Sequence, residues 1–239
     1  MVEQYEPDTA AYNIPADVRL SGPLKVSALE NSLNEIVRRH ETLRTSFISQ
    51  QGQPVQVISP ALKVQLSLID LQELPEAERE TAVARLAKEE MRVPFNLAQA
   101  PLLRATLVRL RDDEHVFLLT MHHIVSDGWS IEILMREMSA LYEAFVTGKD
   151  LSLSDLPIQY ADFAHWQREW LQGEVFEKQL AYWTRRLHGN LPVLSLPADR
   201  PHPPAPTWPA ATAPATEITA IALSDAISTW SAPLPRIPR

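Results

Sequence analysis

Residues 116–130 read VFLLTMHHIVSDGWS, and this stretch predicts the centre of the fold. The apolar run from Val116 to Met121 is typical of a strand that is buried on both faces. Two histidines follow it directly, and an aspartate and a glycine come soon after. Beyond Ser130, apolar residues recur at spacings of three and four, which predicts an amphipathic helix from Ser130 to Val146. A strand, a polar loop and a helix therefore follow one another.

The polar loop contains His122, His123, Asp127 and Gly128. Successive strand residues point to opposite faces, so His122 and His123 cannot both face one reactant if the strand continues through them. We therefore expect one structural and one functional histidine. Asp127 follows on a turn that Gly128 allows to close tightly, and its carboxylate can hold an imidazole, a guanidinium or a backbone amide. We interpret Asp127 as the organiser of the loop.

The remaining patterns predict an α/β fold, a two-layer sandwich in which helices flank a mixed sheet. Helix 26–40, with a capping box from Ser27 to Glu30, and helix 130–146 are expected to pack on the sheet. Pro15 places the first strand at a sheet edge or itself at a strand start, and strands 102–110 and 116–121 are expected to pair antiparallel. The other expected elements are strands 14–20, 43–48, 55–58 and 64–69, with a hairpin turn at 51–53, and helices 75–92, 160–171 and 176–187.

Composition narrows the class of protein. The chain has 239 residues, 45% of them hydrophobic, a net charge of -8 and no cysteine. Such a chain can bury a substantial core, but its acidity and its lack of Lys/Arg clusters argue against a nucleic-acid partner. Without cysteine there is no disulfide or thiolate site. No targeting segment or membrane-length apolar run is visible, so we expect a cytoplasmic protein with no membrane partner.

Three blocks of sequence resemble one family. Residues 122–128 (HHIVSDG) resemble the HHxxxDG signature of condensation domains in nonribosomal peptide synthetases, which are relatives of chloramphenicol acetyltransferase. Residues 39–47 (RHETLRTSF) resemble the RHExLRTxF block of that family. Residues 160–166 (YADFAHW) resemble its YxDFAVW block, with His165 in place of the usual valine. The three blocks occur in the family's order and spacing.

The resemblance implies the chemistry. An amine on an acceptor carrier protein attacks a thioester on a donor peptidyl carrier protein, and both substrates are held on 4'-phosphopantetheine arms, so the chain itself binds no cofactor or metal. Adenylation and carrier domains of a synthetase are the implied partners. His123 either accepts the proton of the amine or positions it. The resemblance assigns the catalytic signature to His123, His122, Asp127 and Gly128, with structural support from Arg39 and Arg44.

Details within these blocks give further expectations. Arg39 and Arg44 have two interpretations, as guanidinium partners of Asp127 or, for Arg39, as a cation at the end of helix 26–40. The backbone amides of Gly128 and Trp129 either face an oxyanion or cap the following helix. The two histidines exclude the heterocyclising subtype and Gly128 excludes the epimerising one. The resemblance is therefore strongest to members that join an L donor to an L acceptor.

The resemblance also bears on the extent of the domain. Residues 4–200 are similar to the N-terminal lobe of a condensation domain, incomplete at both ends, and the second lobe is not recognisable. We expect residues 201–239, which are rich in Pro, Ala and Thr, to form a disordered tail that is not family sequence, through a shifted reading frame or a truncated gene model. A fragment that lacks the opposite wall of its channel should show feeble or no turnover and expose apolar surface that promotes aggregation.

Other interpretations stay open. An acyltransferase that uses coenzyme A or a carrier-bound acyl group, or a non-catalytic remnant, would share the same motifs. A zinc site would need His122, His123 and Asp127, but adjacent strand histidines diverge. A serine hydrolase would need Ser126 in a GxSxG context, which is absent. The aromatic residues of helices 160–171 and 176–187 are interpreted as core, because aromatics at helical spacing usually bury area.

Overall fold

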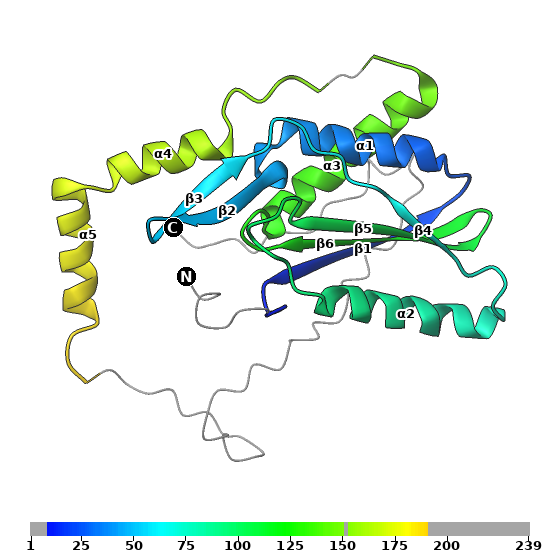
Figure 1. The fold of residues 1–239 in the computed structure, drawn as a ribbon, viewed down its shortest axis with the longest axis horizontal. Helices are drawn as coiled ribbons and strands as arrows, with labels where there is room; N and C mark the ends of the chain where they lie inside the picture. The colour runs from blue at the N-terminus through cyan, green and yellow to red at the C-terminus, as the bar shows by residue number, and fades with distance from the viewer. Residues whose placement is uncertain (1–8, 151–152, 191–239) are drawn as a thin grey trace. The chain divides into compact units, whose positions relative to one another are not determined.

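The computed structural model describes residues 9–150 and 153–190 (Figure 1), and the chain divides into two units between Asp155 and Leu156. The tail at 201–239 lies outside the described residues. The strands are β1 (Asn13–Ser21), β2 (Thr45–Gln50), β3 (Gln53–Ile58), β4 (Ser67–Asp70), β5 (Leu103–Arg111) and β6 (Glu114–His122). The helices are α1 (Val26–Arg39), the 3-10 turn η2 (Glu41–Arg44), α2 (Glu76–Arg92), α3 (Gly128–Thr147), α4 (Tyr160–Trp170) and α5 (Gly173–Arg186).

The main sheet has the strand order β1-β6-β5-β4. Strand β6 pairs antiparallel with β1 and with β5, and β4 pairs parallel with β5, so the sheet is mixed. Met121 lies opposite Ile14 on one side and Leu103 on the other, which confirms that β6 is an inner strand. Pro15 lies in β1 at the sheet edge, where its missing N–H interrupts no ladder, as predicted.

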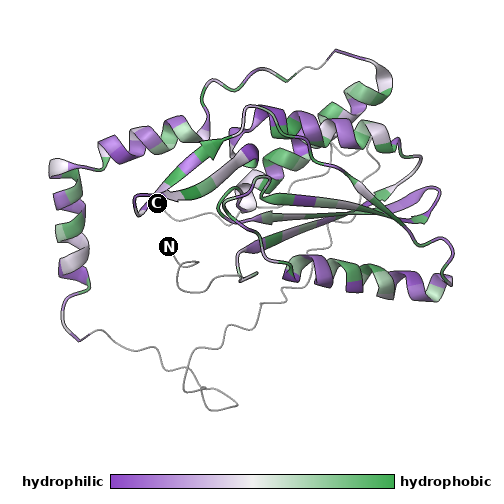
Figure 2. Cartoon of the chain, viewed as in Figure 1, coloured by the Kyte–Doolittle hydropathy of each residue, from purple (hydrophilic) through white to green (hydrophobic). Residues whose placement is uncertain are grey.

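Alternation along β6 sends its side chains into two separate cores. Phe117, Leu119 and Met121 join the larger core with residues of α1 and α3, whereas Val116 and Leu118 join a smaller core with α2. The prediction that helices 26–40 and 130–146 pack on a mixed sheet is thus confirmed. Helix α2 adds a layer on the opposite face, which makes the sheet the middle layer of three. Figure 2 shows β5 and β6 as mostly hydrophobic, whereas α2 carries both kinds of residue.

Some local predictions were wrong. Helix α1 begins after Lys25, which gives no side-chain cap, and Ser27 lies inside the helix, so the predicted capping box does not form. The strand expected from Leu43 begins at Thr45, because η2 occupies the preceding turn. The predicted hairpin is present: β2 and β3 pair antiparallel, and Gly52 adopts a φ of 76°, which favours glycine.

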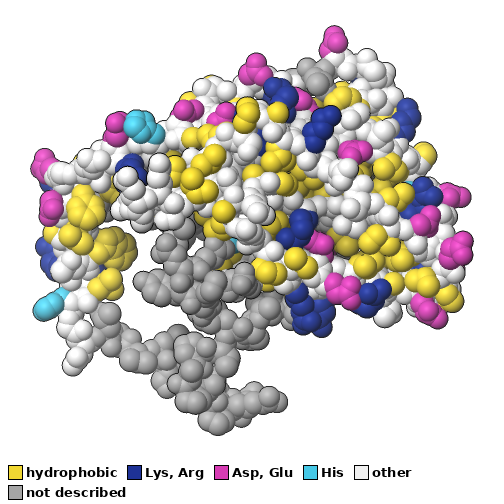
Figure 3. Space-filling view, viewed as in Figure 1, with side chains coloured by type: hydrophobic (Ala, Val, Ile, Leu, Met, Phe, Trp, Pro, Cys, Tyr) yellow, Lys and Arg dark blue, Asp and Glu magenta, His cyan; other side chains and the backbone are white. Residues whose placement is uncertain are grey.

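The second unit contains α4 and α5, and the interpretation of their aromatics as core residues was wrong. Neither helix has a buried residue, and Trp166 and Trp183 are 53% and 55% exposed. Figure 3 shows hydrophobic side chains at the surface over α5. On α4 the helical spacing brings successive rings within 5.9 Å of each other, but no other described element of this unit covers the rings of either helix. None of the helices in the described ranges is both long and apolar enough to cross a membrane.

Candidate active-site loop

His122 is the last residue of β6 and its side chain is buried, 4% exposed. The ring lies 5.9 Å from the ring of Tyr12 and 6.2 Å from that of Phe95, measured between centroids. The backbone N–H of Ile124 donates to its Nδ1 at 3.1 Å. Burial, and then the neighbouring His123, lower the pKa of His122 to about 4, so this imidazole is neutral at pH 7. His122 has the environment expected of the structural histidine.

His123 lies just beyond the strand and is exposed. Its backbone N–H donates to the carbonyl of Tyr12 at 2.8 Å, and its Nδ1 lies 2.9 Å from the carbonyl oxygen of Ser126. A carbonyl only accepts hydrogen bonds, so Nδ1 carries the hydrogen and the lone pair of the neutral ring resides on Nε2. The ring is thus held in the tautomer that can accept a proton at Nε2. The two histidines diverge, as their positions along a strand predicted.

Asp127 caps the N-terminus of α3. Its Oδ1 accepts hydrogen bonds from the Ser130 N–H at 2.8 Å and from the Ser130 hydroxyl at 2.6 Å. These bonds, the side-chain one first, hold the pKa of Asp127 below its ordinary value. Asp127 therefore organises the loop by holding a backbone amide, one of its three predicted partners. This geometry favours the capping interpretation of the first turn.

Of the interpretations left open for Arg39 and Arg44, pairing with Asp127 is not observed. Arg39 pairs with Glu137 at 3.3 Å and donates to the carbonyl of Ser154 at 2.9 Å. Arg44 pairs with Glu41 at 3.0 Å, within its own 3-10 turn. The reason is the packing of α1 against α3, which brings the side chain of Arg39 to Glu137 in the middle of α3.

Glu137 forms the centre of a buried charged cluster that the sequence reasoning missed. It is 8% exposed, and besides Arg39 it contacts His40, whose Nε2 lies 2.9 Å from Oε2. Burial alone raises the pKa of Glu137, but the hydrogen bonds from His40 and Arg39 outweigh burial and keep that pKa below its ordinary value. The available signal was an acidic residue next to Met138, inside the apolar stripe of the helix.

Gly128 begins α3, and its backbone does not require glycine. It has no positive φ, and a Cβ built there would meet no atom within 4 Å. The expected role of Gly128 in tightening the turn is therefore not supported by its conformation. In the described parts of the chain, no group of three or more His, Asp or Glu side chains could hold a metal ion.

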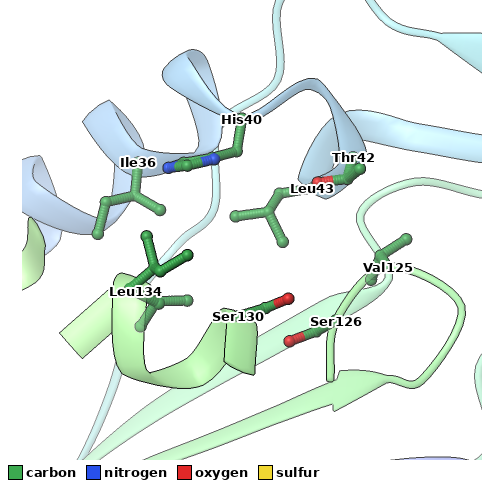
Figure 4. Close-up of a pocket in the computed structure, with 9 residues that line it drawn as sticks. Ile36, His40, Thr42, Leu43, Val125, Ser126, Ser130 and Leu134 are labelled. Carbon is green, nitrogen blue, oxygen red and sulfur yellow. The ribbon is translucent and has the colours of Figure 1, made fainter. Parts of the chain in front are cut away.

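A small cavity lies beside the loop, between the ends of α1 and α3 and the turn η2 (Figure 4). Its volume is about 100 Å³. Ser126, whose carbonyl accepts the hydrogen bond from His123, is one of its lining residues. The full lining consists of Ile36, His40, Thr42, Leu43, Val125, Ser126, Ser130, Ile133 and Leu134.

Comparisons with known proteins show which proteins the chain is similar to. One of the linear gramicidin synthase proteins of Brevibacillus parabrevis is 52% identical over 206 residues, which cover 86% of this chain and 3% of that protein. The starter condensation domain of a rhizomide synthetase mutant, solved in a product-released conformation, has a TM-score of 0.74 at 22% identity, covering 84% of this chain and 46% of that one. The X-domain from teicoplanin biosynthesis has a TM-score of 0.69 at 31% identity, with coverage of 80% and 42%.

The fold is therefore an α/β lobe similar to part of the solved starter condensation domain and of the solved X-domain. A family model described as the condensation domain matches residues 1–221, and the chain belongs to that family, as the three sequence blocks predicted. The family comprises amide-forming acyltransferase domains of nonribosomal peptide synthetases. The match extends past residue 200, and the chain spans less than half of the solved chains to which it is similar.

Proposed function

We propose that this chain carries the catalytic loop of a condensation domain that joins an L-configured donor to an L-configured acceptor. The amine of the acceptor thioester attacks the carbonyl carbon of the donor thioester. A C–N bond forms, the C–S bond breaks, and the thiol returns to the phosphopantetheine arm of the donor carrier. The thioester is already activated, so the catalyst orients two bound arms and manages one proton.

The observation that carries the proposal is the state of His123. Its ring is exposed, its Nδ1–H is held by the carbonyl of Ser126, and its Nε2 lone pair is left to accept a proton or a hydrogen bond from the attacking amine. His122 supports this arrangement from the buried end of the strand. Asp127 supports it by accepting the hydrogen bond that fixes the start of α3. Val125, two residues before Asp127, is buried and anchors the loop.

The proposed partners are donor and acceptor peptidyl carrier proteins, with adenylation and carrier domains in the same synthetase. Similarity to a segment that makes up 3% of a gramicidin synthase supports this context. The arginine block contributes indirectly in this proposal: Arg39 holds Glu137 and so anchors α3, and Arg44 closes η2.

The decisive experiment uses chain 1–239 with a donor and an acceptor aminoacyl thioester, each on a carrier protein, and detects the dipeptidyl carrier by mass spectrometry. We expect slow amide formation, and a loss of about a hundred- to ten-thousand-fold in His123→Ala, because a general base contributes that much. His165→Ala is the matched control, since His165 is exposed on α4, and it should keep the rate. Equal rates of amide formation with and without the imidazole of His123 would contradict the proposal.

Two alternatives have their own readouts in this assay. If coenzyme A esters are consumed in preference to carrier thioesters, the chain is a coenzyme A-dependent acyltransferase. If neither is consumed, a binding role is favoured. A binding role has a parallel in the teicoplanin X-domain, which is 31% identical to this chain and has been solved in a complex with OxyB.

A further inference from the structure

The cavity beside the loop has an apolar wall. Five of its nine lining residues are aliphatic: Ile36, Leu43, Val125, Ile133 and Leu134. A cavity of about 150 Å³ holds benzene, with its six carbon atoms, so the volume of about 100 Å³ found here holds about four non-hydrogen atoms. The walls therefore favour a short aliphatic group and exclude a ring system.

One lining side chain has a buried polar atom without a hydrogen-bond partner among the described residues. Ser126 is 7% exposed, and its buried Oγ has no hydrogen-bond partner among the described residues. Ser130 differs, because its hydroxyl donates to Asp127, and His40 differs, because its Nε2 contacts Glu137. Figure 4 shows the oxygens of Ser126 and Ser130 at the cavity. A buried hydroxyl without a partner costs free energy, so a bound group that hydrogen-bonds to it is favoured.

We propose that this cavity binds a short aliphatic group of about four non-hydrogen atoms that carries one hydroxyl, with the size and chemistry of 1-propanol. The hydroxyl exchanges a hydrogen bond with Ser126 Oγ, and the carbon chain contacts the five aliphatic walls. The inference does not depend on the condensing activity. It places a ligand on the residue whose carbonyl holds the ring of His123, so occupancy and the position of that ring are coupled through Ser126.

The test is a titration of chain 1–239 with 1-propanol, followed by NMR of Ile, Leu and Val methyl groups, which report on all five walls. We expect saturable shifts confined to these methyls, with millimolar affinity because the ligand has so few atoms. Ser126→Ala should weaken propanol binding about fivefold, the loss expected for one hydrogen bond. Xenon, which has no hydroxyl, should bind Ser126→Ala at least as well as the unmodified chain.

Ser139→Ala is the matched control. Ser139 lies on α3, its hydroxyl donates to the carbonyl of Met135 at 2.9 Å, and it does not line the cavity, so its removal should leave propanol binding unchanged. If Ser126→Ala fails to fold, Ser126→Cys keeps the size of the side chain with a weaker hydrogen bond and should also weaken binding. Shifts that rise linearly without saturation, or equal propanol affinity in a folded Ser126 variant, would overturn the proposal.

The bound group has two possible sources, a free small alcohol or the end of a substrate chain. Hydroxybutyryl and butyryl thioesters of N-acetylcysteamine distinguish them. Displacement of propanol by the hydroxybutyryl thioester, and not by the butyryl one, would assign the site to the end of a hydroxyacyl chain. Saturable binding of propanol without such displacement would assign it to a free alcohol.

Discussion

Two neighbouring histidines at the end of β6 have opposite environments. His122 is enclosed by aromatic rings and neutral, whereas His123 is exposed and tied through Nδ1 to a carbonyl. The difference follows from the alternation of side chains along a strand, which sends the last strand residue inward and releases the next one into the loop. A pair that reads as one motif in sequence therefore divides into a packing residue and a candidate reactive residue.

The buried neutral ring of His122 predicts acid sensitivity. The pKa of His122 is about 4 in the folded chain, against 6.5 for an ordinary histidine, so between these values the unfolded chain binds a proton that the folded chain does not. The free energy of unfolding should therefore fall as the pH is lowered through this window, by about 2 kcal/mol between pH 7 and pH 5 from this residue.

Denaturant unfolding at pH 7 and pH 5 checks this expectation. In His122→Asn the side-chain oxygen can accept the hydrogen bond from Ile124, but nothing titrates, so the loss of stability at pH 5 should shrink by about that amount. His165→Asn, which removes an exposed histidine, should behave like the unmodified chain. The same pH dependence in His122→Asn and in the unmodified chain would refute the assignment.

Helices α1 and α3 are joined by a charged contact inside an otherwise apolar interface. Glu137 on α3 contacts Arg39 and His40 at the end of α1, while their apolar faces share the larger core. Buried charges are tolerated only when they are paired, because each one loses its hydration. We therefore expect this contact to set the register of α1 and α3 more than it adds net stability, and to anchor the helix that follows the candidate active-site loop.

Removal of one partner from this cluster should be costly. We expect Glu137→Ala to lower the free energy of unfolding by about 3 kcal/mol or more, because it removes the buried carboxylate that contacts both Arg39 and His40. Glu132→Ala, which removes an exposed carboxylate from the same helix, should change it by less than about 0.5 kcal/mol.

The double variant Arg39→Met with Glu137→Met should recover much of that loss, because it removes both charges and keeps the volume. Thermal and denaturant unfolding measure all three variants. A Glu137→Ala protein as stable as Glu132→Ala would show that the cluster contributes nothing.

Helix α4 of the second unit exposes a row of aromatic rings. Tyr160, Phe163, Trp166 and Trp170 follow one another along α4, with centroid distances of 5.9, 5.7 and 5.7 Å. All four are at least 38% exposed. Large contiguous apolar patches on a soluble surface mark interaction sites or promote association. The row is therefore the surface of this chain that we expect to associate most readily.

Replacing the two indoles that stack in this row should reduce self-association. We expect chain 1–239 to show concentration-dependent association in sedimentation velocity, and the double variant Trp166→Gln with Trp170→Gln to shift it toward monomer. Trp129→Gln is the control, because Trp129 is 65% exposed but lies in the first turn of α3, outside the row. Association that is absent, or unchanged in the double variant, would contradict this expectation.

Local patterns predicted much of this molecule. The apolar run before His122 identified the inner strand, Pro15 identified the edge strand, and the spacing of apolar residues placed the helices to within a few residues. Sequence patterns did not decide between several possible partners: pairing of Arg39 and Arg44 with Asp127 was one open interpretation and is not observed, and Ser27 was wrongly predicted as a cap. Propensity and periodicity predict where helices and strands form and which face is apolar, but they do not predict which side chain of another element a residue contacts.

The amino-acid sequence by itself therefore specified a strand, a loop with two histidines and a helix, because side-chain alternation and helical periodicity follow from the geometry of the backbone. The packed fold added what the order of residues does not contain. The approach of α1 to α3 brought Arg39 and His40 to Glu137, and the ends of both helices, with η2, enclosed the cavity around Ser126. Arg39 and His40 lie about a hundred positions before Glu137 in the sequence. Contacts between residues so far apart in the chain form only when whole helices pack against one another.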